Sequence, residues 1–128
     1  QGGSIINVSS DLGVIAPNQN LYKKEEISEE LQSVKPVTYS VIKHGLNGLT
    51  KYVSTYWADR NVRCNSICPG GVFNNQPEDF LNKVSKLIPL GRMAEKEELN
   101  GIIIYLLSDA SSYVNGSIIS IDGGRTSW

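Results

Sequence analysis

The chain has 128 residues, of which 40% are hydrophobic and 20% are charged, a composition typical of a globular domain or of part of one. The 12 basic and 13 acidic residues give a net charge of −1 without a basic block, so nucleic acid is not expected as a partner. No apolar run approaches the roughly 20 residues that span a bilayer. The N-terminus also lacks the basic and apolar regions of a signal peptide. We therefore expect no membrane partner and a cytoplasmic protein.

The chain contains two cysteines, Cys64 and Cys68, and one histidine. In one continuous strand the two thiols would share a face at a separation too long for easy bridging. We expect buried free thiols, which fit a reducing cytoplasm. Because there is one histidine and no second pair of cysteines, no metal site is expected.

The chain opens with an apolar strand and a long polar segment. Residues 4–8 form a short run of mostly branched residues that ends at Ser9-Ser10, as is typical of a buried parallel strand. Residues 11–35 are polar, and within them residues 25–32 are predicted to form a short helix. Pro36 prevents that helix from continuing into the next segment.

The longest helical pattern covers residues 38–59. Its apolar residues recur at spacings of three and four and form one stripe, which consists of Ile42, Leu46, Leu49, Val53 and Trp57. Gly45 and Gly48 lower the helix propensity of this segment. Glycine inside a helix predicts that another part of the structure packs close to the backbone there.

The second half continues the alternation of strands and helices. A strand over residues 62–68 stops at Pro69-Gly70-Gly71, and a last strand over residues 117–121 ends in Asp122-Gly123-Gly124. Helices are predicted over residues 78–87 and 95–108, with a break at 89–92 between them. In the second helix the residues expected to face inward are Leu99, Ile102, Ile103, Leu106 and Leu107. Strands that alternate with helices predict an α/β fold, a parallel sheet with helices on both faces.

Tyr39 and Lys43 form the sharpest chemical pattern. Residues four apart share one face of a helix, and a lysine ammonium near a phenol favours the phenolate. Such a tyrosine can act as a general acid and base. Taken alone, the pair is better explained as two long side chains on an exposed helix face.

Two strand ends give this pair a chemical context. The strand at residues 4–8 delivers the hydroxyls of Ser9 and Ser10 at its carboxyl end, and the strand at 62–68 ends in the Pro-Gly turn. Open parallel sheets bind ligands outside the carboxyl ends of their strands. The Tyr39–Lys43 helix is expected to begin at the same edge.

Four motifs in this order resemble the short-chain dehydrogenase/reductase family. They are the strand that ends in Ser-Ser, the Tyr-x-x-x-Lys helix, the Asn65-x-x-x-Pro-Gly strand exit, and Gly116 followed by the last strand and Asp-Gly-Gly. The resemblance implies a Rossmann-type, doubly wound parallel sheet. Residues 1–128 would be the C-terminal, catalytic part of one such domain, without its first strands and its nucleotide-binding glycine turn.

The resemblance also implies roles for particular residues. Ser10 matches the serine that hydrogen-bonds the substrate oxygen, whereas a structural role is expected for Ser9. Tyr39 matches the catalytic acid and base. Lys43 matches the lysine that assists the tyrosine and holds the nicotinamide ribose.

The implied cofactor is NAD or NADP. Pro69, Gly70 and Val72 match the loop that meets the nicotinamide, although Gly70 also suits a simple turn at a strand exit. Three departures stand out. No G-x-G-x-x-G occurs, Asn74 replaces a threonine often found after this loop, and residues 21–35 form an insertion.

These matches predict an NAD(P)-dependent oxidoreductase that acts on a carbonyl or alcohol of a small molecule. The insertion, the Pro69-Gly70-Gly71-Val72 loop and the 124–128 ending are similar to family members of bacterial surface-polysaccharide and flagellin-sugar synthesis. This suggests a hydroxylated sugar, free or nucleotide-linked, unless the insertion is a surface excursion without substrate contact. The alternatives are a 3-oxoacyl ketoreductase and a truncated, non-catalytic chain that only packs against partners. The aromatic residues of the long helix, with the family resemblance, predict a homo-oligomer, either a dimer or a tetramer.

Overall fold

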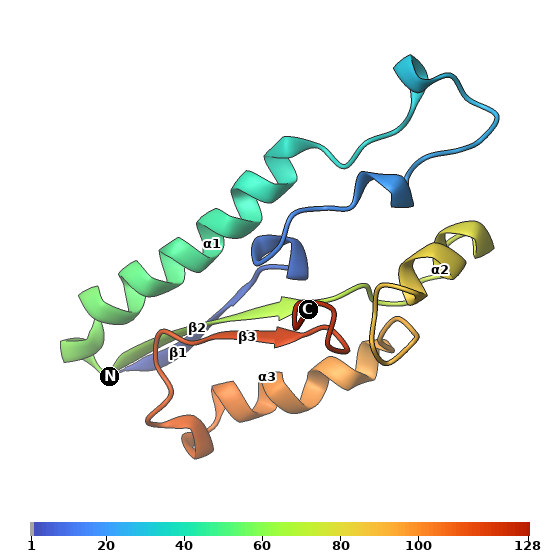
Figure 1. Ribbon diagram of the computed structural model, residues 1–128. Coiled ribbons are helices and arrows are strands. Elements are labelled where there is room, and N and C mark those ends of the chain that lie inside the picture. Colours follow the sequence, from blue (N-terminus) through green and yellow to red (C-terminus); the bar gives the residue numbers. More distant parts are fainter. Residues whose placement is uncertain (1) are drawn as a thin grey trace.

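The computed structural model describes residues 2–128, which are organised by a three-stranded parallel sheet (Figure 1). Its strands are β1 (Gly3–Val8), β2 (Val62–Pro69) and β3 (Ile118–Ile121), in the order β1-β2-β3. The three predicted strands agree with these bounds to within one residue at each end. The predicted α/β class with a parallel sheet is confirmed.

Helices connect the parallel strands and lie on both sides of the sheet (Figure 1). Helix α1 (Val37–Tyr56) joins β1 to β2, whereas α2 (Glu78–Ser85) and α3 (Asn100–Leu107) join β2 to β3. Short 3-10 turns complete the connections at Asp11–Gly13, Gln19–Leu21, Glu29–Leu31, Ala58–Arg60, Lys96–Leu99 and Asp109–Ser111. Because all three strands run in the same direction, their carboxyl ends meet at one edge of the sheet, where a ligand is expected. None of the described helices is both long and apolar enough to cross a bilayer.

The face of α1 that packs on the sheet is polar. Its buried residues are Asn47, Thr50 and Ser54. The Asn47 amide donates to the carbonyl of Gly13 at 2.9 Å and accepts from the hydroxyl of Ser66 at 2.8 Å. A buried polar face is tolerated because its groups are hydrogen-bonded.

The apolar stripe of α1 consequently does not face the sheet. Ile42, Leu49 and Trp57 are 61%, 47% and 43% exposed, whereas Leu46 and Val53 are partly buried. Among residues 2–128, no atom outside the helix backbone lies within 4 Å of a Cβ built on Gly45 or Gly48, so the expected close packing is not found there. Periodicity reveals that a helix has an apolar face but does not reveal what covers it.

The insertion differs from its predicted conformation. Residues 25–32 do not form a helix, and only the 3-10 turn Glu29–Leu31 lies within them. The side chain of Gln32 closes the segment instead, because it accepts from Lys24 N at 2.8 Å and donates to Lys24 O at 2.7 Å and to Ile27 O at 2.5 Å. These bonds satisfy backbone groups that a helix would otherwise pair.

The root of the insertion is anchored in a small hydrophobic core. Leu21 is buried there with Val84, Ile88 and Met93. Lys83 of α2 also donates to the backbone carbonyl of Lys23 at 2.9 Å. The insertion therefore leaves the molecule from a fixed base beside α2.

The predicted helix over residues 95–108 is split in two. A 3-10 turn, Lys96–Leu99, precedes the α-helix Asn100–Leu107. Leu106 is fully buried, but Leu107, which was expected to face inward, is 56% exposed. The carbonyl of Leu106 accepts hydrogen bonds from Ser4 Oγ at 2.7 Å and from Arg63 Nη2 at 3.2 Å, which ties the helix to the sheet.

Both cysteines are buried and free, as predicted. Cys64 and Cys68 are 0% exposed on β2. Burial raises the pKa of the Cys64 thiol, against a smaller opposing effect of its hydrogen bond with Thr50. A protonated, inaccessible thiol is chemically inert.

Candidate active site

The carboxyl end of β1 presents Ser9 and Ser10, which are both buried. Ser10 caps the turn that follows the strand, because its Oγ accepts a hydrogen bond from Leu12 N at 3.1 Å. The Ser10 hydroxyl donates to Asp11 Oδ1 at 2.9 Å. Ser9 has the structural role expected of it, since its hydroxyl donates to the backbone carbonyl of Lys43 at 2.7 Å.

The first two turns of α1 carry Tyr39 and Lys43. Pro36 caps this helix in an extended conformation, and Tyr39 N donates to the Pro36 carbonyl at 3.1 Å. Lys43 Nζ lies 5.6 Å from the centroid of the Tyr39 ring and donates to the carbonyl of Val8 at 3.0 Å. Lys43 thus spans from the tyrosine to the strand end that carries Ser10, and the structure brings the three predicted catalytic residues to one edge.

A second lysine lies beside Tyr39. Lys35 Nζ lies 3.8 Å from the centroid of the Tyr39 ring, a cation–π geometry. Sequence reasoning missed this contact because Lys35 precedes the helix, outside its regular spacing. The last residue of the insertion is therefore also part of the tyrosine's surroundings.

A buried ion pair stands directly behind Ser10. Arg125 Nη1 lies 2.7 Å from Asp11 Oδ2, and the two side chains are only 8% and 4% exposed. Sequence reasoning missed this pair as well. Two signals were available: an acidic residue next to the serine in an otherwise apolar turn, and an arginine after Asp122-Gly123-Gly124.

Tyr22, at the root of the insertion, also lies near these charges. Its ring packs against Phe80 of α2 with centroids 6.0 Å apart. Partial burial raises the pKa of the Tyr22 phenol, Arg125 lowers it, and Asp11 and Tyr39 raise it further. The insertion thus places an aromatic hydroxyl within electrostatic range of Tyr39.

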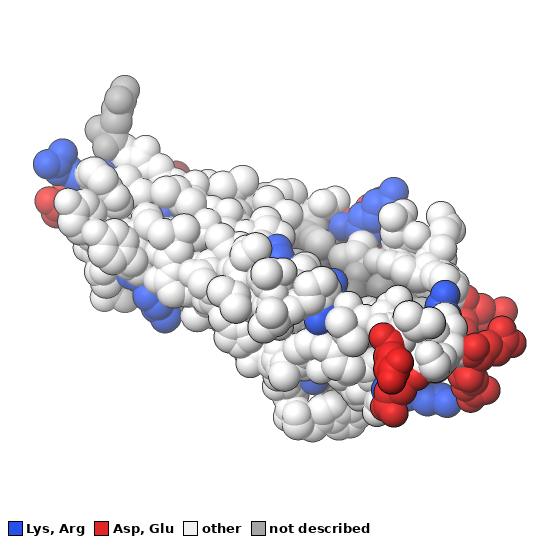
Figure 2. Space-filling view, turned by 90° about the horizontal axis from the view of Figure 1, so that it is seen from above, with Lys and Arg blue, Asp and Glu red and all other residues white. Residues whose placement is uncertain are grey.

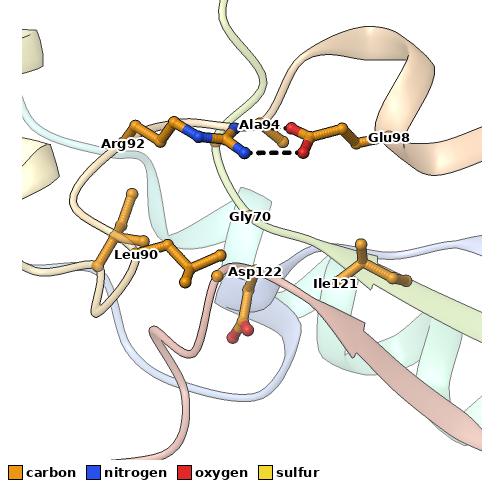
Figure 3. A pocket seen from close by; sticks show the side chains of 10 residues that line it. Gly70, Leu90, Arg92, Ala94, Glu98, Ile121 and Asp122 are labelled. Carbon is orange, nitrogen blue, oxygen red and sulfur yellow. Dashed lines mark hydrogen bonds and ion pairs between the residues drawn. The ribbon is translucent and has the colours of Figure 1, made fainter.

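The loop that leaves β2 forms one wall of a pocket (Figure 3). The pocket holds about 200 Å³ and is lined by Gly70, Gly71, Ile88, Leu90, Arg92, Ala94, Glu98, Ile121, Asp122 and Gly123. Gly70 N donates to Ile121 O at 2.9 Å, and a Cβ on Gly70 would lie 2.9 Å from the Cα of Asp122. Val72 continues the wall through a parallel bridge with Ala94. Packing against β3 thus accounts for Gly70, and the loop that carries Pro69, Gly70 and Val72 is held firmly in place.

Asp122 organises the turn at the end of β3. Partial burial alone would raise the pKa of its carboxyl, but hydrogen bonds from Thr126 and from the backbone of Gly124 outweigh burial and lower the pKa. Thr126 N donates to one carboxylate oxygen at 2.8 Å and Gly124 N to the other at 3.0 Å. Throughout residues 2–128, no group of three or more His, Cys, Asp or Glu side chains has an arrangement that could hold a metal ion.

Comparison with known proteins identifies the family. Residues 26–126 match the family described as Enoyl-(Acyl carrier protein) reductase, a branch of the short-chain dehydrogenases. The chain belongs to the short-chain dehydrogenase/reductase family. It is 35% identical over 122 residues to post-translational flagellin modification protein A of Campylobacter coli, and covers 45% of that protein with 95% of its own length. It is 36% identical over 129 residues to the 3-oxoacyl-[acyl-carrier-protein] reductase FabG of Thermotoga maritima, with coverages of 46% and 97%.

A solved structure of the family has the same fold. The short-chain dehydrogenase of Leptospira borgpetersenii with bound NAD+ matches with a TM-score of 0.86 at 36% identity, over 97% of this chain and 44% of that one. The chain thus spans about half the length of the relatives that it matches.

Proposed function

We propose that the protein to which this chain belongs is an NAD(P)-dependent oxidoreductase that moves a hydride between the nicotinamide and a carbonyl or alcohol carbon of a small molecule. The observation that carries this proposal is the position of Lys43, which spans from the Tyr39 ring to the strand end that holds Ser10. NAD or NADP supplies or accepts the hydride when bound. Residues 1–128 would form the C-terminal part of a single dinucleotide-binding domain.

Each of the three residues has a separate task in this proposal. Tyr39 passes the proton to or from the substrate oxygen, and Ser10 polarises that oxygen by a hydrogen bond. Lys43 places a positive charge 5.6 Å from the centroid of the Tyr39 ring and binds the ribose hydroxyls of the cofactor. An ammonium has three donors, and one of them is used on the Val8 carbonyl, so two are left for a ribose diol.

The residues at the sheet edge fit the nicotinamide end of the cofactor. Besides the free donors of Lys43, the edge offers the backbone of Pro69, Gly70 and Val72, which the pairing with β3 and Ala94 holds in place. We place the nicotinamide carboxamide at the backbone near Val72. Titration of the complete protein with NADH and NADPH, followed by nucleotide fluorescence, tests cofactor binding and separates the two cofactors.

For the substrate we favour a hydroxylated sugar, in free or nucleotide-linked form. The insertion carries Glu25, Glu26, Glu29 and Glu30, and acidic side chains gather at the end of the molecule near the insertion and α2 (Figure 2). A polar segment next to the site suits a substrate with many hydroxyls, and the flagellin modification relative agrees with this class. The alternative is a 3-oxoacyl thioester, which the FabG relative supports.

A panel of substrates distinguishes these classes. The complete protein is offered acetoacetyl-coenzyme A and a nucleotide-linked keto-sugar, and the oxidation of NADH or NADPH is followed by absorbance. Turnover of the keto-sugar supports the sugar proposal, and turnover of the thioester alone contradicts it. If the protein binds neither NADH nor NADPH, with or without substrate, it has the non-catalytic packing role instead.

We also infer that the protein is a homo-oligomer, a dimer or a tetramer, which associates through α1. The exposed face of this helix carries Val41, Tyr52 and Tyr56, each at least 60% exposed, and the two tyrosine rings stack with centroids 5.4 Å apart. Figure 2, which looks down on the molecule of Figure 1, shows a mostly uncharged surface with a few scattered Lys and Arg side chains. The open backbone at Gly45 and Gly48 would allow a second helix to approach closely. Light scattering should give a multimeric mass that Tyr52→Glu lowers, and a monomeric mass of the parent contradicts the inference.

Two buried free thiols suit a reducing compartment. We therefore place the protein in the cytoplasm. Fractionation of cells, with detection of the protein by antibody, tests this placement, and recovery from an extracellular or periplasmic fraction contradicts it.

A further inference from the structure

The hydroxyl of Ser10 is already engaged by its own neighbour. It donates to Asp11 Oδ1 at 2.9 Å and accepts from Leu12 N at 3.1 Å. A serine hydroxyl has one proton to donate, and in this arrangement that proton is used in the hydrogen bond to the Asp11 carboxylate. A substrate oxygen that is to be polarised by Ser10 must compete with Asp11 for that proton.

Arg125 determines how strongly Asp11 competes. It binds the other carboxylate oxygen, Oδ2, at 2.7 Å, and both side chains are nearly excluded from water. A guanidinium this close attracts the carboxylate charge towards Oδ2 and makes Oδ1 a weaker acceptor. Leu12 N, which donates to Oδ1 at 2.7 Å, also occupies part of that oxygen's capacity.

The end of the sheet aims Arg125 at this position. After β3 the chain turns through Gly123 and Gly124, whose φ angles of 63° and 89° favour glycine. Asp122 accepts hydrogen bonds from Gly124 N and Thr126 N, and its own carbonyl accepts from Arg125 N at 3.2 Å. The turn is thus closed on both sides of Arg125.

From this geometry we infer that Asp11 and Arg125 are positioning residues, which hold the Ser10 hydroxyl in place and leave its proton available to the substrate oxygen. The inference rests on the proposed function of Ser10. It makes the segment after β3 part of the active site, although neither charged side chain needs to touch the substrate.

Removal of the positive charge is the first test. Arg125→Met leaves Asp11 as an unpaired acceptor next to Ser10, and we expect kcat to fall about ten- to a hundredfold, because a misdirected catalytic group has a cost of this order. Arg125→Lys keeps the charge and should restore part of the rate. Acetoacetyl-coenzyme A or the keto-sugar serves as substrate, according to which one the parent reduces.

A double-mutant cycle with Ser10→Ala distinguishes positioning from general structural damage. If Arg125 acts through Ser10, Arg125→Met should change kcat less than about twofold in the Ser10→Ala background. An equal loss in both backgrounds overturns the inference. Asp59→Asn is the matched control, because it breaks another arginine–carboxylate pair, Arg60–Asp59, which precedes β2 at the edge of the sheet opposite the site, and it should leave kcat unchanged in both backgrounds.

Crystal structures of the Asp11→Asn and Arg125→Met variants provide a readout without turnover. We expect the Ser10 Oγ to leave its position near Leu12 N in at least one of them, but to stay there in Asp59→Asn. An unmoved hydroxyl in both variants overturns the inference whatever the substrate is. If Ser10→Ala keeps full activity, the proposed function of Ser10 fails, and if only Arg125→Met keeps it, the inference alone fails.

Discussion

The hydroxyl of Ser9 donates a hydrogen bond of 2.7 Å to the backbone carbonyl of Lys43. This bond joins the end of β1 to the second turn of α1, at the residue whose ammonium donates to the Val8 carbonyl. Gly13 packs on the same bond, since a Cβ there would lie 2.8 Å from the Lys43 carbonyl oxygen. The distance between the serine strand and the tyrosine helix is therefore determined by a side chain that need not touch the substrate.

Ser9→Ala should loosen this junction. We expect the free energy of unfolding to fall by about 1 kcal/mol, the net value of one buried hydrogen bond. We also expect kcat to fall more than cofactor affinity, because the helix that carries Tyr39 loses its alignment. Urea unfolding and steady-state kinetics measure the two effects, and an unchanged kcat with reduced stability would show that the junction does not align the site.

Tyr39→Phe should abolish turnover in the complete protein and leave its fold intact. Loss of a general acid and base has a cost of about a hundred- to ten-thousandfold. Tyr113→Phe is the control, because Tyr113 is fully exposed at 102%. Activity of the Tyr39 variant within a few fold of the parent contradicts the assigned role.

Lys43→Ala should weaken both catalysis and cofactor binding. The substitution removes the charge near Tyr39 and the donors proposed for the ribose, as well as the hydrogen bond to the Val8 carbonyl. Calorimetric titration with NADH and NADPH measures affinity, and stopped-flow absorbance measures the rate. A change in cofactor affinity alone would mean that Lys43 does not assist proton transfer. Lys86→Ala, on the exposed side of the segment after α2, serves as the control.

The Arg92–Glu98 pair predicts a dependence of stability on pH. Arg92 binds both carboxylate oxygens of Glu98, at 2.7 and 2.8 Å. The hydrogen bond from Arg92 is the main cause that lowers the pKa of Glu98 from 4.5 to about 2, with a further contribution from the backbone of Glu95. Because the folded pKa lies below the unfolded one, the stabilisation is present above pH 4.5 and is lost as pH falls towards 2.

Urea unfolding at several pH values checks this window. The difference in free energy of unfolding between the parent and Glu98→Gln should be constant above about pH 5 and should disappear between pH 4.5 and about 2. The difference will be small and will decrease with salt, because the pair is exposed. A difference that persists at the acid end would mean that charge is not its source.

Much of the site could be predicted from local sequence signals. Short branched runs that end in Ser9-Ser10 or at Pro69 predicted strands whose bounds hold to within one residue. The spacing of Tyr39 and Lys43 placed both on the first turns of one helix. These signals succeed because strand ends, helix spacing and proline or glycine turns depend on residues that are near each other in the chain.

Other features could not be predicted in this way. The insertion contains Glu29–Leu31 as a 3-10 turn rather than the predicted helix, because the side chain of Gln32 takes over its backbone hydrogen bonds. The face of α1 that packs on the sheet was also missed. Small polar residues can face a sheet when they find hydrogen-bond partners on it, as Asn47 does on β2, while an apolar stripe faces outward.

The sequence by itself determined the order of strands and helices, the parallel α/β class, and the identity of Ser10, Tyr39 and Lys43 as candidates. Tertiary structure alone decided that Arg125 lies behind Ser10, because Asp11 and Arg125 are 114 residues apart and meet only when β1 and β3 join the same sheet. It likewise decided that Ser9 holds Lys43 and that Lys35 lies over the Tyr39 ring. Local spacing specifies which groups a segment offers, whereas the packing of distant segments specifies which of those groups meet.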